Sequence, residues 1–147
     1  MGRNIVTGPE VGHWVASHTG GGYFAERSEA IGLQRDGELV AGVIYENWNH
    51  RSIVCHIAFL GRLTSAYLAA VFHYPFEVCD VDKIIAPIRG DNRKAMSLVE
   101  NMGFLEEARI KDAAPTGDIV FYTLTRDKCR FLENRYGQKF ASAAASA

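Results

Sequence analysis

The stretch VDKIIAPIRGDNRKAMSLVENMGF, residues 81–104, joins an apolar run to a polar turn and an amphipathic segment. The run VDKIIAPI (81–88) is typical of a strand, and from Asn92 to Met102 apolar residues recur at helical spacing. Gly103 follows where a helix commonly stops. The apolar face expected on this helix consists of Ala95, Leu98, Val99 and Met102. The stretch therefore predicts a strand, a turn and a helix, with Asn92 at the turn.

A second unit of the same kind precedes it. RSIVCHIAFLG (51–61) is β-branched and apolar enough for a central strand, and LTSAYLAAVFHYPF (63–76) follows with apolar residues at helical spacing. Thr64 is a candidate N-cap, because its side-chain oxygen can accept a hydrogen bond from a free N–H of the first turn. The chain is thus expected to contain two consecutive strand-helix units.

The flanking segments predict strands and one further helix. NIVTG (4–8) indicates a strand, residues 9–22 a short helix, and Arg35-Asp36-Gly37 a hairpin between two apolar runs. Residues 103–113 and 117–126 indicate a closing hairpin around an Ala-Pro-Thr-Gly turn. We therefore expect an α/β fold with a mixed sheet (α+β), with mostly antiparallel N-terminal strands, two strand-helix units and a C-terminal hairpin. Residues 1–140 are expected to form one domain, and 141–147 a disordered tail.

Composition excludes several classes of protein. With 147 residues, 48% of them hydrophobic, the chain is long enough for one buried core. Its 16 basic and 17 acidic residues give no electrostatic reason to expect a nucleic-acid partner. Three widely spaced cysteines, Cys55, Cys79 and Cys129, suggest neither a disulfide framework nor a metal site. No signal peptide or membrane span is evident, so a cytoplasmic protein that does not bind membranes is expected.

The order of elements resembles the GNAT acetyltransferase fold, and residues Thr64 to Arg126 carry the resemblance. N92-R-K-A95-M-S-L98-V-E-N-M-G103-F104 is similar to the family segment N-x-x-A-x-x-L-x-x-x-x-G-F. The hairpin E-E-A-R-I-K-D…G117-D118-I-V-F-Y122-T is similar to that of the ribosomal-protein alanine acetyltransferase branch. The resemblance implies an acetyl-CoA-dependent enzyme that acetylates a primary amine.

The resemblance also implies a cofactor site. The family's phosphate loop, Q/R-x-x-G-x-G/A, uses backbone N–H groups at a helix N-terminus to bind a diphosphate. Here only Gly61 matches, while Ala58 and Leu63 stand at the other two places. Each site residue also has an ordinary structural interpretation, a turn or a cap, and Asn92 in particular is a favoured N-cap. The residues expected to contact acetyl-CoA are Ile57, Ala58, Gly61, Arg62, Thr64, Ser65, Asn92 and Arg93.

Proton transfer has three candidate residues. Many family members carry a Tyr seven positions after the Asn, where it protonates the leaving thiolate, but this chain has Val99. His56 is the first candidate base, since an imidazole changes charge near neutral pH, although a packed core His is the alternative. Glu46 is the second candidate, and Tyr122 is a candidate acid whose alternative role is cross-strand packing.

Two hypotheses of different classes follow. The first is an N-acetyltransferase in which the amine attacks the thioester directly, and the second is a non-catalytic module of the same fold that binds CoA or a protein. The acceptor is left open among a protein N-terminus, a Lys side chain and a small amine. Because little chain separates the first strand from the Asp-Gly hairpin, the acceptor groove is expected to be open or to be completed by a second subunit in a homodimer. No metal is expected.

Overall fold

The computed structural model describes residues 3–132, in which seven strands form one mixed sheet in the order β1-β2-β3-β4-β5-β7-β6. The strands are β1 (Arg3–Thr7), β2 (Glu29–Arg35), β3 (Glu38–Glu46), β4 (Ser52–Phe59), β5 (Lys83–Arg89), β6 (Leu105–Ala114) and β7 (Gly117–Thr125). The helices are α1 (Pro9–Thr19), α2 (Ser65–His73) and α3 (Arg93–Met102). All strand pairs are antiparallel except β4 and β5. The predicted fold class and order of elements are confirmed.

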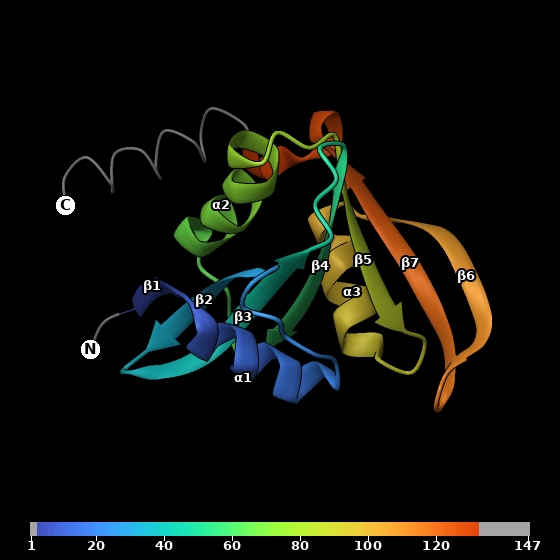
Figure 1. The fold of residues 1–147 in the computed structure, drawn as a ribbon, viewed down its shortest axis with the longest axis horizontal. Helices are drawn as coiled ribbons and strands as arrows, with labels where there is room; N and C mark the ends of the chain where they lie inside the picture. The colour runs from blue at the N-terminus through green and yellow to red at the C-terminus, as the bar shows by residue number, and fades with distance from the viewer. Residues whose placement is uncertain (1–2, 133–147) are drawn as a thin grey trace.

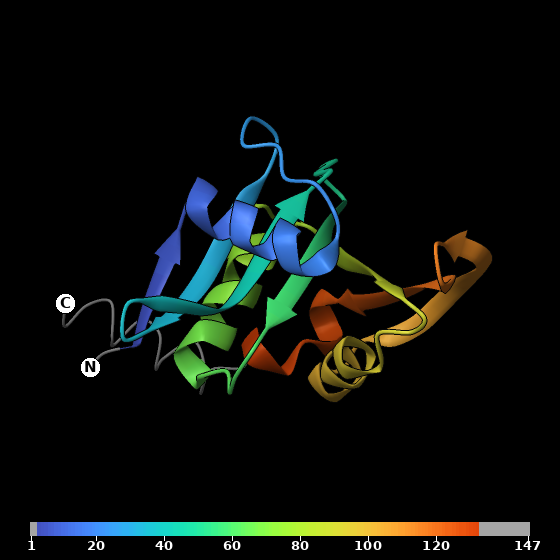
Figure 2. The same cartoon turned by 90° about the horizontal axis from the view of Figure 1, so that it is seen from below.

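The helices cover the two faces of the sheet unequally. Figures 1 and 2 show α1 lying across β2 to β4 on one face, with α2 and α3 on the other. The larger apolar core lies beneath α2 and α3 and includes Phe72, Phe76 and Tyr122, each at most 2% exposed. A smaller core lies beneath α1, around Val11 and Val15. The sheet is therefore buried on both faces only in its N-terminal part.

The turn between β2 and β3 follows from its two residues. Asp36 and Gly37 both have positive φ, 55° and 84°, as a two-residue type I′ hairpin requires. Asp tolerates the left-handed region better than most residues, and Gly enters it without steric cost. The predicted Asp-Gly hairpin is confirmed, and beyond a register shift between Leu33 and Gln34 the two strands pair with Gly32 facing Gly42.

These two glycines allow α1 to approach the sheet closely. A methyl group at Gly42 would lie 2.5 Å from Val15 Cγ2, and one at Gly32 would lie 2.9 Å from the Val11 methyl carbons. Both contacts are shorter than packed carbon atoms tolerate, so only glycine fits beneath the helix. The position of α1, and of the loop that follows it, depends on this glycine pair.

The second helix ends earlier than the sequence suggests. The pattern predicts a helix as far as Phe76, but α2 ends at His73 and continues as a π-helical turn, Tyr74–Val78. Pro75 has no N–H to donate to the Val71 carbonyl, which breaks the α-helical ladder. The Tyr45 hydroxyl donates to that carbonyl at 2.5 Å instead. A side chain of β3 therefore satisfies the backbone group that the proline leaves free.

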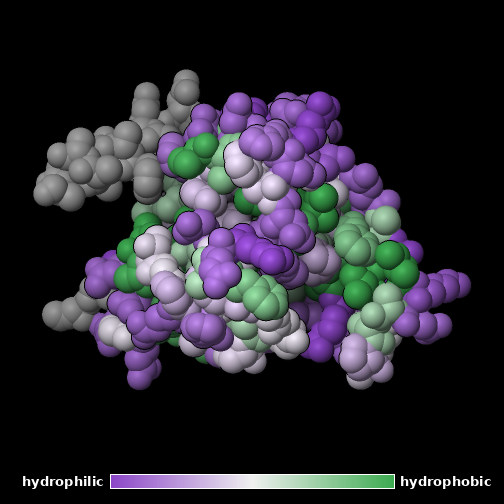
Figure 3. Space-filling view, in the orientation of Figure 1, coloured by the Kyte–Doolittle hydropathy of each residue, from purple (hydrophilic) through white to green (hydrophobic). Residues whose placement is uncertain are grey.

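No described helix covers the front of β5, β7 and β6 in Figure 1, and apolar side chains gather over that region in Figure 3. Leu105 and Ile110 of β6 are 62% and 52% exposed. The same strand lies at the edge of the sheet. This part of the sheet is an exposed apolar surface at a sheet edge.

Some expectations fall outside the described residues, and others can be checked only within them. The predicted domain end at residue 140 and the predicted tail, 141–147, lie outside them. Within residues 3–132, all three cysteines are free thiols, and no group of His, Cys, Asp or Glu is arranged to hold a metal ion. None of the described helices combines the length and apolar character needed to cross a bilayer.

Candidate active site

The sheet splits between β4 and β5. Their parallel pairing covers only three positions, Ser52 with Lys83, Ile53 with Ile84, and Val54 with Ile85. Beyond these pairs β4 continues beside β3 to Phe59, while β5 continues beside β7 to Arg89. A wedge-shaped cavity of about 370 Å³ opens between the diverging strands. Its lining includes His56, Ile57, Pro87 and Asn92. The last residue of α1 with the two glycines after it, and the turn between β6 and β7, also line it.

The two candidate bases are in direct contact at this wedge. His56 Nε2 lies 2.7 Å from Glu46 Oε2, and the two side chains are 27% and 22% exposed. Ile44 pairs with His56 and Glu46 with Val54, so both side chains project from the same face of the β3–β4 ladder. His56 and Glu46, expected as alternatives, therefore form one hydrogen-bonded pair.

The chemistry of this pair assigns its proton. A carboxylate only accepts hydrogen bonds, so the contact requires the hydrogen on His56 Nε2. In the neutral imidazole, Nδ1 then carries the free lone pair. In such a pair the imidazole is the base. The carboxylate orients it and stabilises its protonated form. The imidazole can take a proton from an amine, and the Glu46 carboxylate then compensates the positive charge of the imidazolium.

Asn92 caps α3 with only part of its side chain. Its Oδ1 accepts a hydrogen bond from the Ala95 N–H at 3.2 Å, which confirms the N-cap interpretation. The amide Nδ2 is not used in the cap, and Asn92 is exposed and lines the wedge. The cap and the expected contact with acetyl-CoA are therefore compatible, because each uses a different atom of the amide.

The loop from Gly61 to Ser65 joins the end of β4 to α2. Thr64 caps the helix by accepting a hydrogen bond from the Tyr67 N–H at 3.1 Å. Among the described residues, the N–H groups of Gly61, Arg62 and Leu63 have no acceptor. A methyl group at Gly61 would meet nothing within 4 Å, so the protein alone does not require glycine there. These features fit a diphosphate bound by backbone N–H groups at a helix N-terminus.

The other residues expected to contact acetyl-CoA differ in how accessible they are. Ile57 lines the wedge. Arg62, Ser65 and Arg93 are exposed, where the two guanidinium groups can offset phosphate charge. Ala58 is 8% exposed and packs against the core beneath α1, so only its backbone is available to a ligand. Most of these residues are therefore exposed or line the wedge.

Tyr122 lies away from the pair, on the face that α3 covers. It is 1% exposed, and its hydroxyl donates to Glu100 Oε2 of α3 at 2.6 Å. Burial, and then the hydrogen bond and the charge of Glu100, raise the pKa of Tyr122 to about 12. Val99, on the same helix, is 2% exposed in the core. These contacts favour the packing role of Tyr122 over that of an acid.

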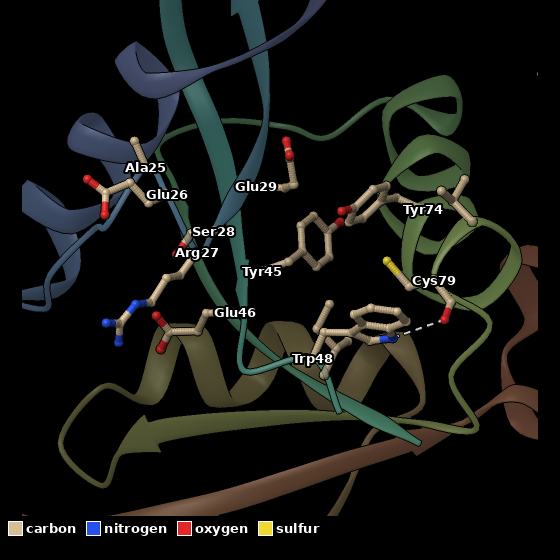
Figure 4. Close-up of a pocket in the computed structure, with 12 residues that line it drawn as sticks. Ala25, Glu26, Arg27, Ser28, Glu29, Tyr45, Glu46, Trp48, Tyr74 and Cys79 are labelled. Atoms are coloured by element: carbon tan, nitrogen blue, oxygen red, sulfur yellow. Dashed lines mark hydrogen bonds between the residues drawn. The ribbon is translucent and has the colours of Figure 1, made fainter. Parts of the chain in front are cut away.

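Sequence reasoning did not identify a second hollow, of about 310 Å³, beside Glu46. Figure 4 shows residues from three segments around it: the loop before β2, the end of β3 and the π-helical turn. The run Glu26-Arg27-Ser28-Glu29 is the one sequence signal for it, since four consecutive polar residues lead into a buried strand. Tyr45 and Tyr74 carry no such signal because only the fold brings them together.

Comparison with known proteins defines the fold but not the individual protein. The chain matches no family model and no curated protein. Similar solved structures include a probable acetyltransferase, with 21% identity, a TM-score of 0.59 and coverage of 69% of this chain and 63% of that chain. The chain thus spans less than two thirds of that relative.

Two further similar structures are N-acetyltransferases. Mutant forms of the spermidine/spermine N-acetyltransferase SpeG from Vibrio cholerae share 15% identity, with a TM-score of 0.68 over 86% of this chain and 96% of that chain. Campylobacter jejuni PseH in complex with acetyl coenzyme A shares 16%, with a TM-score of 0.54 over 68% and 69%. The protein has the fold of GNAT acetyltransferases, as predicted. These similarities do not single out the ribosomal-protein alanine acetyltransferase branch.

Proposed function

We propose that this protein is an acetyl-CoA-dependent N-acetyltransferase that transfers the acetyl group to a primary amine. The observation that carries the proposal is the hydrogen-bonded His56–Glu46 pair at the wedge between β4 and β5. A titratable pair in a cavity is where proton transfer is expected. The complex of the PseH structure with acetyl coenzyme A supports the co-substrate.

Acetyl-CoA supplies an activated acyl group as a thioester. The N–H groups of Gly61 to Ser65 would bind its diphosphate, and Asn92 Nδ2 would donate to its pantetheine arm. The amine nitrogen forms a bond to the carbonyl carbon as the carbon–sulfur bond breaks, and the sulfur leaves as the thiolate of CoA, which takes a proton from water. His56 Nδ1 takes the proton that the amine must lose, while Glu46 stabilises the imidazolium. No covalent intermediate on the protein is needed, and proximity of the two substrates supplies much of the acceleration.

Finer proposals concern the acceptor, the oligomeric state and the location. The acceptor is an amine, since the similar SpeG structures are of spermidine N-acetyltransferases, and a protein N-terminus, as the alanine acetyltransferase resemblance implies, remains an alternative. A homodimer is supported by the uncovered apolar face of β7 and β6. A single catalytic domain over 1–140 and a cytoplasmic location remain predictions.

Substitution of the pair tests the proposal. His56→Ala should slow turnover by about 10²–10⁴-fold and remove the rising limb of the pH profile of kcat/KM. Glu46→Gln should act on the same step, so the double variant should be little slower than the slower single variant. Acetyl-CoA affinity, measured by calorimetry, should stay unchanged. Near-normal turnover of folded His56→Ala would refute the assignment.

A non-catalytic module that binds CoA is the second candidate. It is favoured by Val99, which is buried where many relatives carry a Tyr, and by Leu63 in the phosphate loop. Calorimetry with acetyl-CoA, followed by assays of thiol release with a panel of amines, separates the two. Binding without release for every amine, protein N-termini and Lys peptides included, would favour the module.

A further inference from the structure

The hollow beside Glu46 has the features of a ligand site. It lies at the end of β3, bounded by the loop before β2 and by the π-helical turn after α2 (Figure 4). Its volume of about 310 Å³ suits a small aliphatic molecule rather than a folded partner. None of the residues expected to bind acetyl-CoA lines it. It is therefore available for the second substrate.

Ser28 gives the first sign of a missing ligand. It is 7% exposed, and its Oγ is fully buried with no hydrogen-bond partner among the described residues. An unpaired buried hydroxyl is unfavourable and usually marks a missing partner. Ser28 lines the hollow, so an N–H or ammonium group bound there would supply that partner.

The carboxylates give the second sign. Glu26 and Glu29 line the hollow, and no described residue forms a hydrogen bond or an ion pair with the side-chain carboxylate of either. Burial, and then the Glu29 charge, raise the pKa of the Tyr23 hydroxyl, as expected beside an uncompensated anion. With Glu46, the lining carries three carboxylates and one guanidinium, that of Arg27, so it is acidic. It favours a cation and disfavours a phosphorylated or carboxylated acceptor.

The aromatic walls give the third sign. Tyr45 and Tyr74 lie with ring centroids 5.0 Å apart, and Trp48 is 49% exposed beside them. The polar tips of two of these side chains are already used: Tyr45 donates to Val71 O, and Trp48 Nε1 donates to Cys79 O at 3.1 Å. Their apolar ring surfaces are what remains for a ligand. Such surfaces suit alkyl chains and ammonium groups.

Glu46 connects this hollow to the wedge. It lines the hollow, while its partner His56, 2.7 Å away, lines the wedge. We infer that the hollow binds the distal ammonium group of a small aliphatic diamine or polyamine whose other amine reaches the His56–Glu46 pair. The inference rests on the proposed function and adds the class of acceptor. Ser28, Glu29 and the aromatic walls select the dication.

Binding measurements on the full chain, without acetyl-CoA, test the site by itself. We compare 1,4-diaminobutane with 1-aminobutane, which has the same carbon chain and one charge fewer. Calorimetry should show at least about tenfold tighter binding of the diamine, the effect of one charge-assisted contact. Glu29→Gln should remove most of this preference, and Ser28→Ala should reduce it about threefold. Glu38→Gln, an exposed substitution on β3 outside the hollow, should leave it intact.

Turnover separates this inference from the proposed function. If the diamine is acetylated with a kcat/KM about tenfold above that of the monoamine and Glu29→Gln abolishes the difference, both stand. Equal kcat/KM for the two amines, or better use of a Lys peptide, would overturn the inference and leave the transferase intact. Diamine binding that depends on Glu29, without thiol release for any amine, would support the site and contradict the proposed transferase activity. Equal affinities for the two amines would overturn the site directly.

Discussion

Tyr122 shows how the neighbours of a buried hydroxyl can favour a packing role for it. Its hydroxyl donates to Glu100, and its pKa of about 12 is well above that of an ordinary thiol, about 8.5. A phenol held so firmly in its protonated form is a poor donor to a leaving thiolate at neutral pH. Its observed contacts instead tie β7 to α3.

Tyr122→Phe separates these roles. We expect the free energy of unfolding to fall by about 0.5–1.5 kcal/mol, the usual net worth of one hydrogen bond, with turnover nearly unchanged. Urea titration and steady-state assays with the same amine measure the two quantities. A loss of turnover of ~10²-fold or more in a folded variant would restore Tyr122 as the general acid.

Residue identity predicted the base candidates but not their contact. His56 and Glu46 are ten positions apart, and the expected strands alone do not say which residues of β3 and β4 face each other. The loop between these strands contains Asn47 and His50 at positive φ, so no standard turn sequence fixes its register. The hollow was harder still to predict, because Ser28, Tyr45 and Tyr74 come from three separate segments.

At the scale of elements, the start of α3 combines a cap with an unused donor. Asn92→Ala should lower the free energy of unfolding by about 0.5–2 kcal/mol and also weaken acetyl-CoA binding. Asn92→Ser keeps a capping oxygen but lacks the amide N–H, so it should retain the melting temperature of the wild type while still binding acetyl-CoA less well. Thermal melts and calorimetry on both variants measure this difference. If Asn92→Ser bound acetyl-CoA like the wild type, the cap alone would explain Asn92.

Two glycines in strand and loop should respond oppositely to alanine. Gly42→Ala places a methyl group 2.5 Å from Val15 Cγ2, and such overpacking should cost about 1–3 kcal/mol of stability. Gly61→Ala has open space, so stability should be unchanged or slightly higher, whereas acetyl-CoA affinity should fall because a diphosphate must approach that backbone. Denaturant titration and calorimetry test the pair. An unchanged acetyl-CoA affinity in Gly61→Ala would remove the diphosphate from this loop.

Element order was more predictable than element ends. The Asp36-Gly37 turn and the stop at Gly103 were readable because each requires positive φ, which few residues adopt. The end of α2 was not, because the broken ladder at Pro75 is repaired by Tyr45 from a distant strand. Local chemistry thus fixed the turns, whereas tertiary contacts set the helix boundary.

The whole molecule should lose stability steeply in alkali. Burial raises the pKa of the Cys55 thiol to about 12, and it also raises those of the Tyr45 and Tyr67 hydroxyls. The unfolded chain releases these protons at lower pH than the folded protein, so rising pH favours unfolding. The loss should begin near pH 9 for the thiol and steepen above pH 10 for the phenols, by up to about 1.4 kcal/mol per pH unit for each group.

Urea midpoints at pH 8 to 11 measure this dependence. Tyr67→Phe, which removes a hydrogen bond to the Ile31 carbonyl, should be less stable than wild type at pH 8 yet decline less steeply above pH 10. Parallel curves for the two proteins would show that Tyr67 ionises equally easily in the folded and unfolded states.

The three-position pairing of β4 with β5 also gives the fold its softest degree of freedom. Longer antiparallel ladders hold the strands on either side, β1 to β4 in one half of the sheet and β5 to β7 in the other. Each half is therefore more rigid than the junction between them. The chain between the two halves passes through α2 and the π-helical turn, which pack on the larger core. Thermal motion can therefore widen or narrow the wedge between β4 and β5 without breaking any antiparallel ladder. A molecule bound between the two halves would reduce that motion.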